Sequence, residues 1–246
     1  MIFAIVRRLG LFALVLVPIM MVMGNEKSYP YHGVYSDPER YASAIEKFLA
    51  ADAEQFPPAG AVLCIGSSSM LGWHSTIEED FAPLTVIPRG FGGSTMYDVL
   101  YYADKIVLPY EPRAILIYEG ENDISAGVLP ETILEVFNTF VDLVHTEFPE
   151  TRIYFISLKP SIRRWHLWDK MQITNALIAR ECARNDLLTF YDISAGMLNE
   201  EGEPKPEIFL GDELHMNDLG YDIWRERIIP RLKAAELKYE KDVETE

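Results

Sequence analysis

Two segments far apart in this 246-residue chain carry a hydroxyl nucleophile and a base with its carboxylate. Gly66-Ser67-Ser68-Ser69 offers the serines, and Asp212-Glu213-Leu214-His215 places a carboxylate three residues before an imidazole. That spacing lets Asp212 fix the tautomer of His215 and stabilise the imidazolium that forms when the histidine takes a proton from serine. These residue types predict nucleophilic catalysis by serine on an acyl group.

Two further segments offer hydrogen-bond donors for the negative charge that acyl transfer develops on oxygen. Gly92-Gly93-Ser94 has glycines, whose backbone N–H groups can closely approach an oxyanion, and Gly120-Glu121-Asn122-Asp123 has a side-chain amide. The glycines do not match a nucleotide-binding loop, because Gly-x-Gly-x-x-Gly would need a glycine where Thr95 stands.

Each segment by itself also has an ordinary structural interpretation. The serines suit a helix N-cap, the glycines a turn, Asn122 a loop, and Asp212 with His215 a cap beside a solvated ring. The residues alone do not decide which serine of the triplet acts. The Gly-x-Ser-x-Gly elbow of α/β-hydrolases is absent, because Met70 stands at its last glycine position. No His or Cys spacing matches a metal site, so we expect neither a metal nor another cofactor.

Composition narrows the class of partner. A formal net charge of −16 and a pI near 4.7 argue against nucleic acid, which is bound through lysines and arginines that neutralise phosphates. The two cysteines, Cys64 and Cys182, lie in apolar patterns, and we predict that both are core residues.

Residues 1–24 differ from the rest of the chain. Arg7 and Arg8 precede an uncharged apolar stretch, residues 9–23, as in an export signal. A cleaved signal peptide and a retained N-terminal membrane anchor are equally compatible with the pattern, and a buried N-terminal helix is the remaining alternative. Either export form places the protein in the periplasm or another extracytoplasmic space. Residues 25–37 are predicted to be a linker or surface strap, and residues 38–246 the folded domain.

Apolar runs alternate with helical patterns through the predicted domain. The predicted strands are residues 61–65, 84–88, 113–118, 152–157 and 187–191, and the predicted helices are residues 38–55, 95–106, 131–148, 167–185 and 217–239. Strict alternation predicts an α/β fold, a three-layer α/β/α sandwich around a five-stranded parallel sheet in flavodoxin-like order. Three of the four functional segments directly follow a strand, where α/β proteins bind ligands, and residues 212–215 lie beyond the fifth strand.

In chain order, the four segments resemble the blocks of the SGNH hydrolases, also called GDSL-type esterases and lipases, over residues 61–221. The resemblance implies that Ser68 is the nucleophile and that Asp212 and His215 complete the triad. It also implies an oxyanion hole made of the N–H groups of Ser68 and Gly93 and the amide of Asn122.

The first block departs from the family pattern, since the usual Gly-Asp-Ser reads Gly66-Ser67-Ser68. The missing aspartate is not a triad member, so the departure does not exclude activity. Trp73 and the run Arg89-Gly90-Phe91-Gly92-Gly93 are similar to a subgroup whose first block reads Gly-Ser-Ser-Ser.

The resemblance implies metal-independent hydrolysis of carboxylic esters on a small acyl, lipid or acetylated-sugar substrate. Two alternatives stay open: acyl transfer by the same triad, and a non-catalytic envelope binding module on this scaffold. Some side chains near the strand ends could shape the substrate pocket, although core packing explains the aromatic ones equally well. They are Trp73, Arg89, Tyr97, Lys159 and Trp165.

Overall fold

The computed structural model describes Tyr31 and residues 33–240, and its centre is a sheet of five parallel strands. The strand order is β2-β1-β3-β4-β5, which is the predicted flavodoxin-like order. The strands are β1 (Val62–Gly66), β2 (Val86–Gly90), β3 (Ala114–Tyr118), β4 (Arg152–Ile156) and β5 (Leu188–Tyr191).

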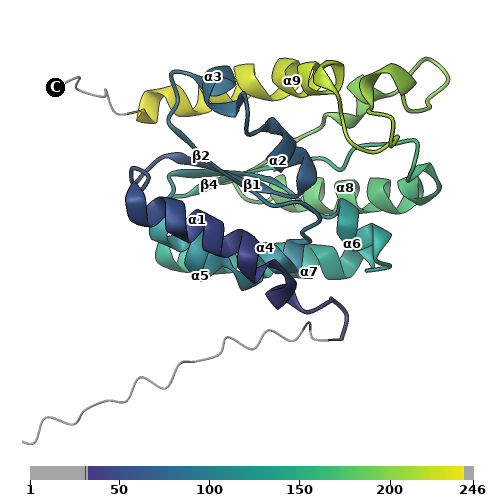
Figure 1. The fold of residues 1–246 in the computed structure, drawn as a ribbon. Coiled ribbons are helices and arrows are strands. Elements are labelled where there is room, and N and C mark those ends of the chain that lie inside the picture. The colour runs from purple at the N-terminus through teal and green to yellow at the C-terminus, as the bar shows by residue number, and fades with distance from the viewer. Residues whose placement is uncertain (1–30, 32, 241–246) are drawn as a thin grey trace, which may run out of the picture.

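Helices cover both faces of the sheet and complete the predicted three layers (Figure 1). One face packs against α1 (Ala42–Glu54), α4 (Met96–Tyr101), α5 (Ala103–Ile106), α7 (Pro130–Glu147) and α8 (Trp168–Cys182). The other face packs against α2 (Ser68–Trp73), α3 (Ile77–Phe81) and α9 (Asp218–Glu236). The short helix α6 (Glu121–Ser125) follows β3.

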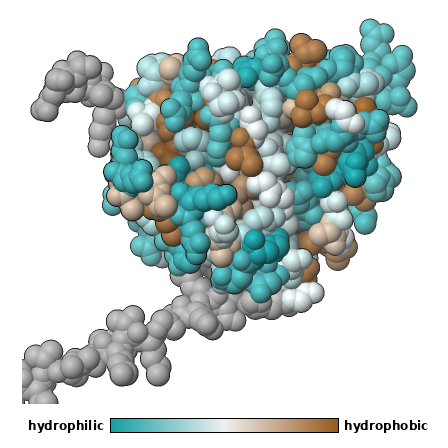
Figure 2. Space-filling model, in the orientation of Figure 1, coloured by the Kyte–Doolittle hydropathy of each residue, from teal (hydrophilic) through white to brown (hydrophobic). Residues whose placement is uncertain are grey.

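The strands are apolar without interruption because both of their faces are buried. In β1, Leu63 and Ile65 face the core with α7, whereas Val62 and Cys64 face the core with α9. Cys64 and Cys182 are buried free thiols, so the prediction that both are core residues is confirmed. The surface in the orientation of Figure 2 is mainly hydrophilic, with hydrophobic residues scattered over it.

Sequence periodicity missed the shortest helices. The predicted helix 95–106 is two helices, α4 and α5, separated at Tyr102, and the predicted helix 38–55 begins as a 3-10 helix, Pro38–Tyr41. The helices α2, α3 and α6 contain only six, five and five residues, too few to show a period of 3.6.

The predicted leader, residues 1–24, lies outside the described residues, as does most of the predicted linker. The described end of that linker packs on the domain, because Tyr31 and Tyr35 are buried and contact the ring of Tyr97 at centroid distances of 5.7 and 5.2 Å. Among the residues that the structure describes, none of the helices is long and apolar enough to span a membrane.

Candidate active site

Ser68 is the first residue of α2, directly beyond the carboxyl end of β1. The turn depends on Gly66, whose φ is +152° and where a Cβ atom would lie 2.3 Å from the carbonyl oxygen of Tyr118. Ser67 and Ser69 are each only 3% exposed, whereas Ser68 is half-buried. The structure therefore presents the middle serine of the triplet to the site.

Ser68, His215 and Asp212 form a continuous hydrogen-bonded chain. The Oγ atom of Ser68 lies 3.0 Å from Nε2 of His215, and Nδ1 of His215 lies 2.5 Å from Oδ2 of Asp212. This is the arrangement in which a histidine can take the serine proton while the carboxylate orients the ring. The side chains of His215 and Asp212 are 40% and 42% exposed.

A small hairpin holds Asp212 and His215. A β-bridge between Phe209 and Met216 closes it, and the N–H of Leu210 donates to the carbonyl of His215 at 2.8 Å. The Oδ1 atom of Asp212 accepts from the N–H groups of Leu214 and His215 at 3.0 and 2.9 Å. Hydrogen bonds from the His215 ring and from these N–H groups hold the pKa of Asp212 well below its usual range, so it remains a carboxylate.

Gly93 and Asn122 lie beyond the carboxyl ends of β2 and β3. Gly93 has a φ of +85°, and within the described residues its N–H has no hydrogen-bond partner. The Nδ2 atom of Asn122 donates to the carbonyl of Ser94 at 2.9 Å, which ties the amide to the glycine loop. Gly92 places this loop beside the nucleophile, since a Cβ atom there would lie 3.9 Å from Cβ of Ser68.

The glycine loop rests on Glu119, a fully buried residue that sequence analysis did not single out. The Oγ atom of Ser94 lies 2.9 Å from the carbonyl of Phe91 and 2.5 Å from Oε1 of Glu119, yet a hydroxyl has one proton to donate. Burial, and then the nearby Asp123, raise the pKa of Glu119 well above its ordinary value. If Glu119 is protonated, it donates to Ser94 while Ser94 donates to Phe91, and both contacts are satisfied.

A second buried network surrounds Glu121, which is 4% exposed. Its Oε2 atom accepts from Nζ of Lys159 at 2.8 Å and from the hydroxyl of Tyr118 at 2.6 Å. Its Oε1 atom accepts from Nη1 of Arg164 at 3.0 Å, and Nη2 of Arg164 donates to Oδ1 of Asn122 at 2.9 Å. Glu121 stands next to Asn122 in sequence, and this adjacency was the one available signal for the network.

None of the five side chains that could shape the substrate pocket is among the residues that line the cavity beside Ser68. Trp73 is 1% exposed and donates to Asp80 at 2.6 Å, inside the core beneath α9. Arg89 is 9% exposed and pairs with Asp52 on α1. Tyr97 packs in the opposite core, Lys159 binds Glu121, and Trp165 stacks on Trp168. Aromatic type and position near a strand end did not distinguish core residues from pocket walls.

The cavity beside Ser68 has a volume of about 450 Å³. It is lined by Ser68, Gly72, Leu210, His215, Met216, Asn217, Asp218 and Tyr221. The hydroxyl of Tyr221 donates to the carbonyl of Ser69 at 2.9 Å, which ties α9 to the helix that carries the nucleophile. The cavity is therefore formed mainly by the hairpin and the start of α9.

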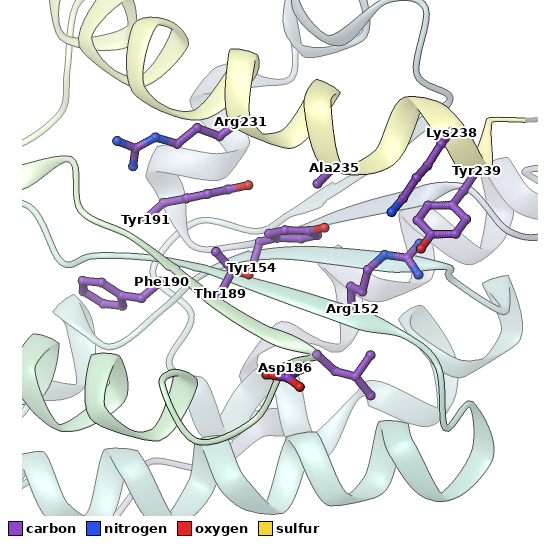
Figure 3. A pocket seen from close by; sticks show the side chains of 11 residues that line it. Arg152, Tyr154, Asp186, Thr189, Phe190, Tyr191, Arg231, Ala235, Lys238 and Tyr239 are labelled. Carbon is purple, nitrogen blue, oxygen red and sulfur yellow. The ribbon is translucent and has the colours of Figure 1, made fainter.

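A second cavity of similar size, about 470 Å³, lies along β5 beside β4 and the end of α9, away from Ser68. Figure 3 shows Arg152 and Tyr154 reaching from the sheet toward the end of α9. Arg152 already donates to both carboxylate oxygens of Glu236, at 2.5 and 2.8 Å, and lies over the ring of Tyr239. In the described part of the chain, no group of three His, Cys, Asp or Glu side chains is arranged to hold a metal ion.

Comparison with known proteins identifies the family of this chain. Residues 59–223 match the model of the GDSL-like lipase/acylhydrolase family. The comparison with curated proteins gives no match.

Solved structures share the fold at low sequence identity. A GDSL-like lipase from Bacteroides thetaiotaomicron is 21% identical, with a TM-score of 0.64 over 81% of this chain and 98% of its own. A mutant acetyl-xylooligosaccharide esterase from Geobacillus is 14% identical, with a TM-score of 0.59 over 72% and 95%. A carbohydrate esterase family 3 protein from Talaromyces cellulolyticus is 15% identical, with a TM-score of 0.58 over 73% and 99%.

Proposed function

Because this chain belongs to the GDSL-like lipase/acylhydrolase family, we propose that it hydrolyses carboxylic esters through an acyl-enzyme formed on Ser68. The observation that carries the proposal is the hydrogen-bonded chain from Ser68 through His215 to Asp212, with distances of 3.0 and 2.5 Å. Gly93 and Asn122 beside this chain supply the donors that a tetrahedral oxyanion needs.

The reaction proceeds in two half-reactions. Oγ of Ser68 attacks the ester carbonyl carbon while Nε2 of His215 takes the serine proton, and negative charge develops on the carbonyl oxygen. The N–H groups of Ser68 and Gly93 and the amide of Asn122 stabilise that charge. His215 then gives its proton to the leaving alcohol, and the acyl-enzyme remains. Water, deprotonated by the same histidine, releases the acid and restores Ser68.

Acetylated sugars and other short acyl esters are the substrates we place first. The support is the likeness to an acetyl-xylooligosaccharide esterase and to an acetyl esterase whose structure contains acetate. A panel of aryl esters of increasing acyl length, with acetylated sugars beside it, ranks the substrates. Adding an acceptor alcohol separates hydrolysis from acyl transfer, since a transferase forms a new ester and a hydrolase forms the free acid.

The decisive experiment changes the three serines one at a time. Ser68→Ala should lose activity by about 10⁶ and escape labelling by a fluorophosphonate probe, because no other group supplies the nucleophile. Ser67→Ala and Ser69→Ala are matched controls on the same turn and should still be labelled. Labelling of Ser68→Ala, or loss of the wild-type rate on addition of a chelator, would overturn the proposal.

We also propose that residues 1–24 direct export, on the evidence of Arg7 and Arg8 ahead of the apolar stretch 9–23. Deleting residues 1–24 should give an active enzyme that is no longer exported. Cell fractionation tests this proposal, and full-length protein found intact in the cytosol would contradict it.

A further inference from the structure

The orientation of the Asn122 amide is fixed by two neighbours of opposite kind. Its Oδ1 atom accepts from Nη2 of Arg164 at 2.9 Å, and its Nδ2 atom donates to the carbonyl of Ser94 at 2.9 Å. A guanidinium only donates and a carbonyl only accepts. Turning the amide over would place its NH₂ group against the guanidinium and its oxygen against the carbonyl oxygen of Ser94. A single orientation therefore satisfies both neighbours.

That orientation leaves one N–H of Asn122 for the substrate. An amide nitrogen carries two hydrogens, and the carbonyl of Ser94 takes one of them. The second hydrogen is the one that the proposed mechanism directs at the oxyanion. The donor is available only while Oδ1 faces Arg164, so the guanidinium sets the direction in which Asn122 donates.

Arg164 is itself held by a buried carboxylate. Its Nη1 atom donates to Oε1 of Glu121 at 3.0 Å, and Glu121 also accepts from Lys159 at 2.8 Å. Burial alone would raise the pKa of Glu121, but Lys159 and Arg164 lower it below its ordinary value, so it stays ionised. Two cations share one carboxylate, which gives this group a formal charge of 2 − 1 = +1 directly behind Asn122.

We propose that Arg164 is a positioning residue that orients and polarises the Asn122 amide toward the oxyanion, an inference that rests on the proposed function. Drawing electron density toward Oδ1 makes the Nδ2 hydrogens better donors, because hydrogen bonds in series strengthen one another. The benefit is larger for an oxyanion than for a neutral carbonyl. Arg164 therefore acts on the transition state more than on substrate binding.

Kinetics of Arg164→Gln test this inference on the full-length protein. We expect kcat to fall by about tenfold to a hundredfold, with KM changed by less than about threefold, because removing an oxyanion donor outright costs about 10²–10³. Arg163→Gln is the matched control, since it removes the same charge from the neighbouring exposed residue. Arg163→Gln should retain the wild-type kcat.

A double-mutant cycle with Asn122→Ala shows whether Arg164 acts through the amide. If it does, Asn122→Ala/Arg164→Gln is no slower than Asn122→Ala alone. Added guanidinium ion should restore part of the rate of Arg164→Ala but not that of Asn122→Ala/Arg164→Ala. If Arg164→Gln fails to fold, Arg164→Lys, which keeps the charge but loses the two-pronged contact, takes its place in the cycle.

Three results would overturn the inference: a wild-type kcat for Arg164→Gln, a rise in KM with kcat unchanged, or equal losses with and without Asn122. None of these results contradicts the proposed function as long as Ser68→Ala is inactive. Activity of Ser68→Ala would instead remove the proposed function itself, so the two failures are distinguishable.

Discussion

The two halves of the proposed site, which we call the base half and the oxyanion half, differ in how they are built. The base half is one exposed hairpin in which Asp212 and His215 are three residues apart and 42% and 40% exposed. The oxyanion half combines the turn after β1, the loop after β2, the helix after β3 and the loop after β4. Its supporting side chains are buried: Glu119 and Lys159 are 0% and 1% exposed.

Solvation explains the difference. Water stabilises the charges of an exposed carboxylate and imidazolium, so the hairpin has only to orient them. A charge in the interior needs a partner or must become neutral. Glu121 has two cationic partners, and burial favours the neutral form of Glu119 by raising its pKa. Changes in the base half should therefore affect catalysis alone, and changes in the oxyanion half should affect catalysis and stability together.

Among the changes that compare the two halves, Asp212→Asn should have the largest effect. The asparagine cannot stabilise the imidazolium and favours the wrong tautomer, so kcat/KM should fall by up to about 10⁴. The melting temperature should stay within a few degrees of wild type, because Asp212 is exposed. Glu213→Gln, in the same hairpin, is the control for loss of an acidic side chain. A large drop in melting temperature for Asp212→Asn would show that the hairpin also stabilises the fold.

Asn122→Ala should have the next largest effect. Loss of one oxyanion donor lowers kcat by about 10²–10³ with little change in KM. The variant also leaves Nη2 of Arg164 and the carbonyl of Ser94 without their shared partner, so the melting temperature should fall as well. Measuring both quantities on one preparation compares the halves directly. An unchanged melting temperature would contradict the predicted coupling of catalysis and stability.

The fall of kcat/KM at low pH, the acid limb of the pH profile, should depend on the base half. A histidine base must be neutral to take the serine proton, so kcat/KM should fall by about tenfold per pH unit on this limb. The lowered pKa of Asp212 keeps it ionised in that range, so one proton governs the limb. In Asn122→Ala, kcat/KM should fall over the same pH range from a lower maximum, whereas in Asp212→Asn that pH range should shift. A limb with a two-proton slope would refute this assignment.

Glu119→Gln should produce the smallest effect, seen in stability rather than rate. Burial raises the pKa of Glu119, so the folded state binds its proton more tightly than the unfolded state, and the free energy of unfolding falls as pH rises. Two more buried carboxyl groups, Asp123 and Asp98, face the same loop. Burial raises the pKa of Asp123 to about 7 and also raises the pKa of Asp98, so both groups also lower the free energy of unfolding as pH rises.

A glutamine imitates the neutral acid, so the melting temperature of Glu119→Gln should decline less than that of wild type as pH rises above about 4.3, the ordinary pKa of glutamate. Its activity should stay within about threefold, because the amide still donates to Ser94. Glu131→Gln, on the exposed first turn of α7, is the control. Equal slopes for Glu119→Gln and wild type would show that Glu119 is ionised in the folded protein.

The sequence predicted one half of the site better than the other. All five strands follow from apolar runs, and Asp212 and His215 are neighbours in the chain. The choice of Ser68 within its triplet rests on the resemblance to the SGNH hydrolases. The partners of the oxyanion half are not neighbours, since Arg164 and Asn122 are 42 residues apart. Lysine and arginine after β4 have no pattern that separates a buried ion pair from a solvated surface, and Lys159 was accordingly predicted to line the pocket.

The self-contained hairpin has a consequence for how proteins of this kind change over evolutionary time. A gene copy released from selection for catalysis can lose Asp212 or His215 at little cost, because Phe209 and Met216 still close the segment. Glu121 cannot drift alone, since its loss would leave Lys159 buried without its partner. Descendants of such a chain that have turned from hydrolysis to binding should therefore have replaced the hairpin residues and still carry the charged group behind Asn122.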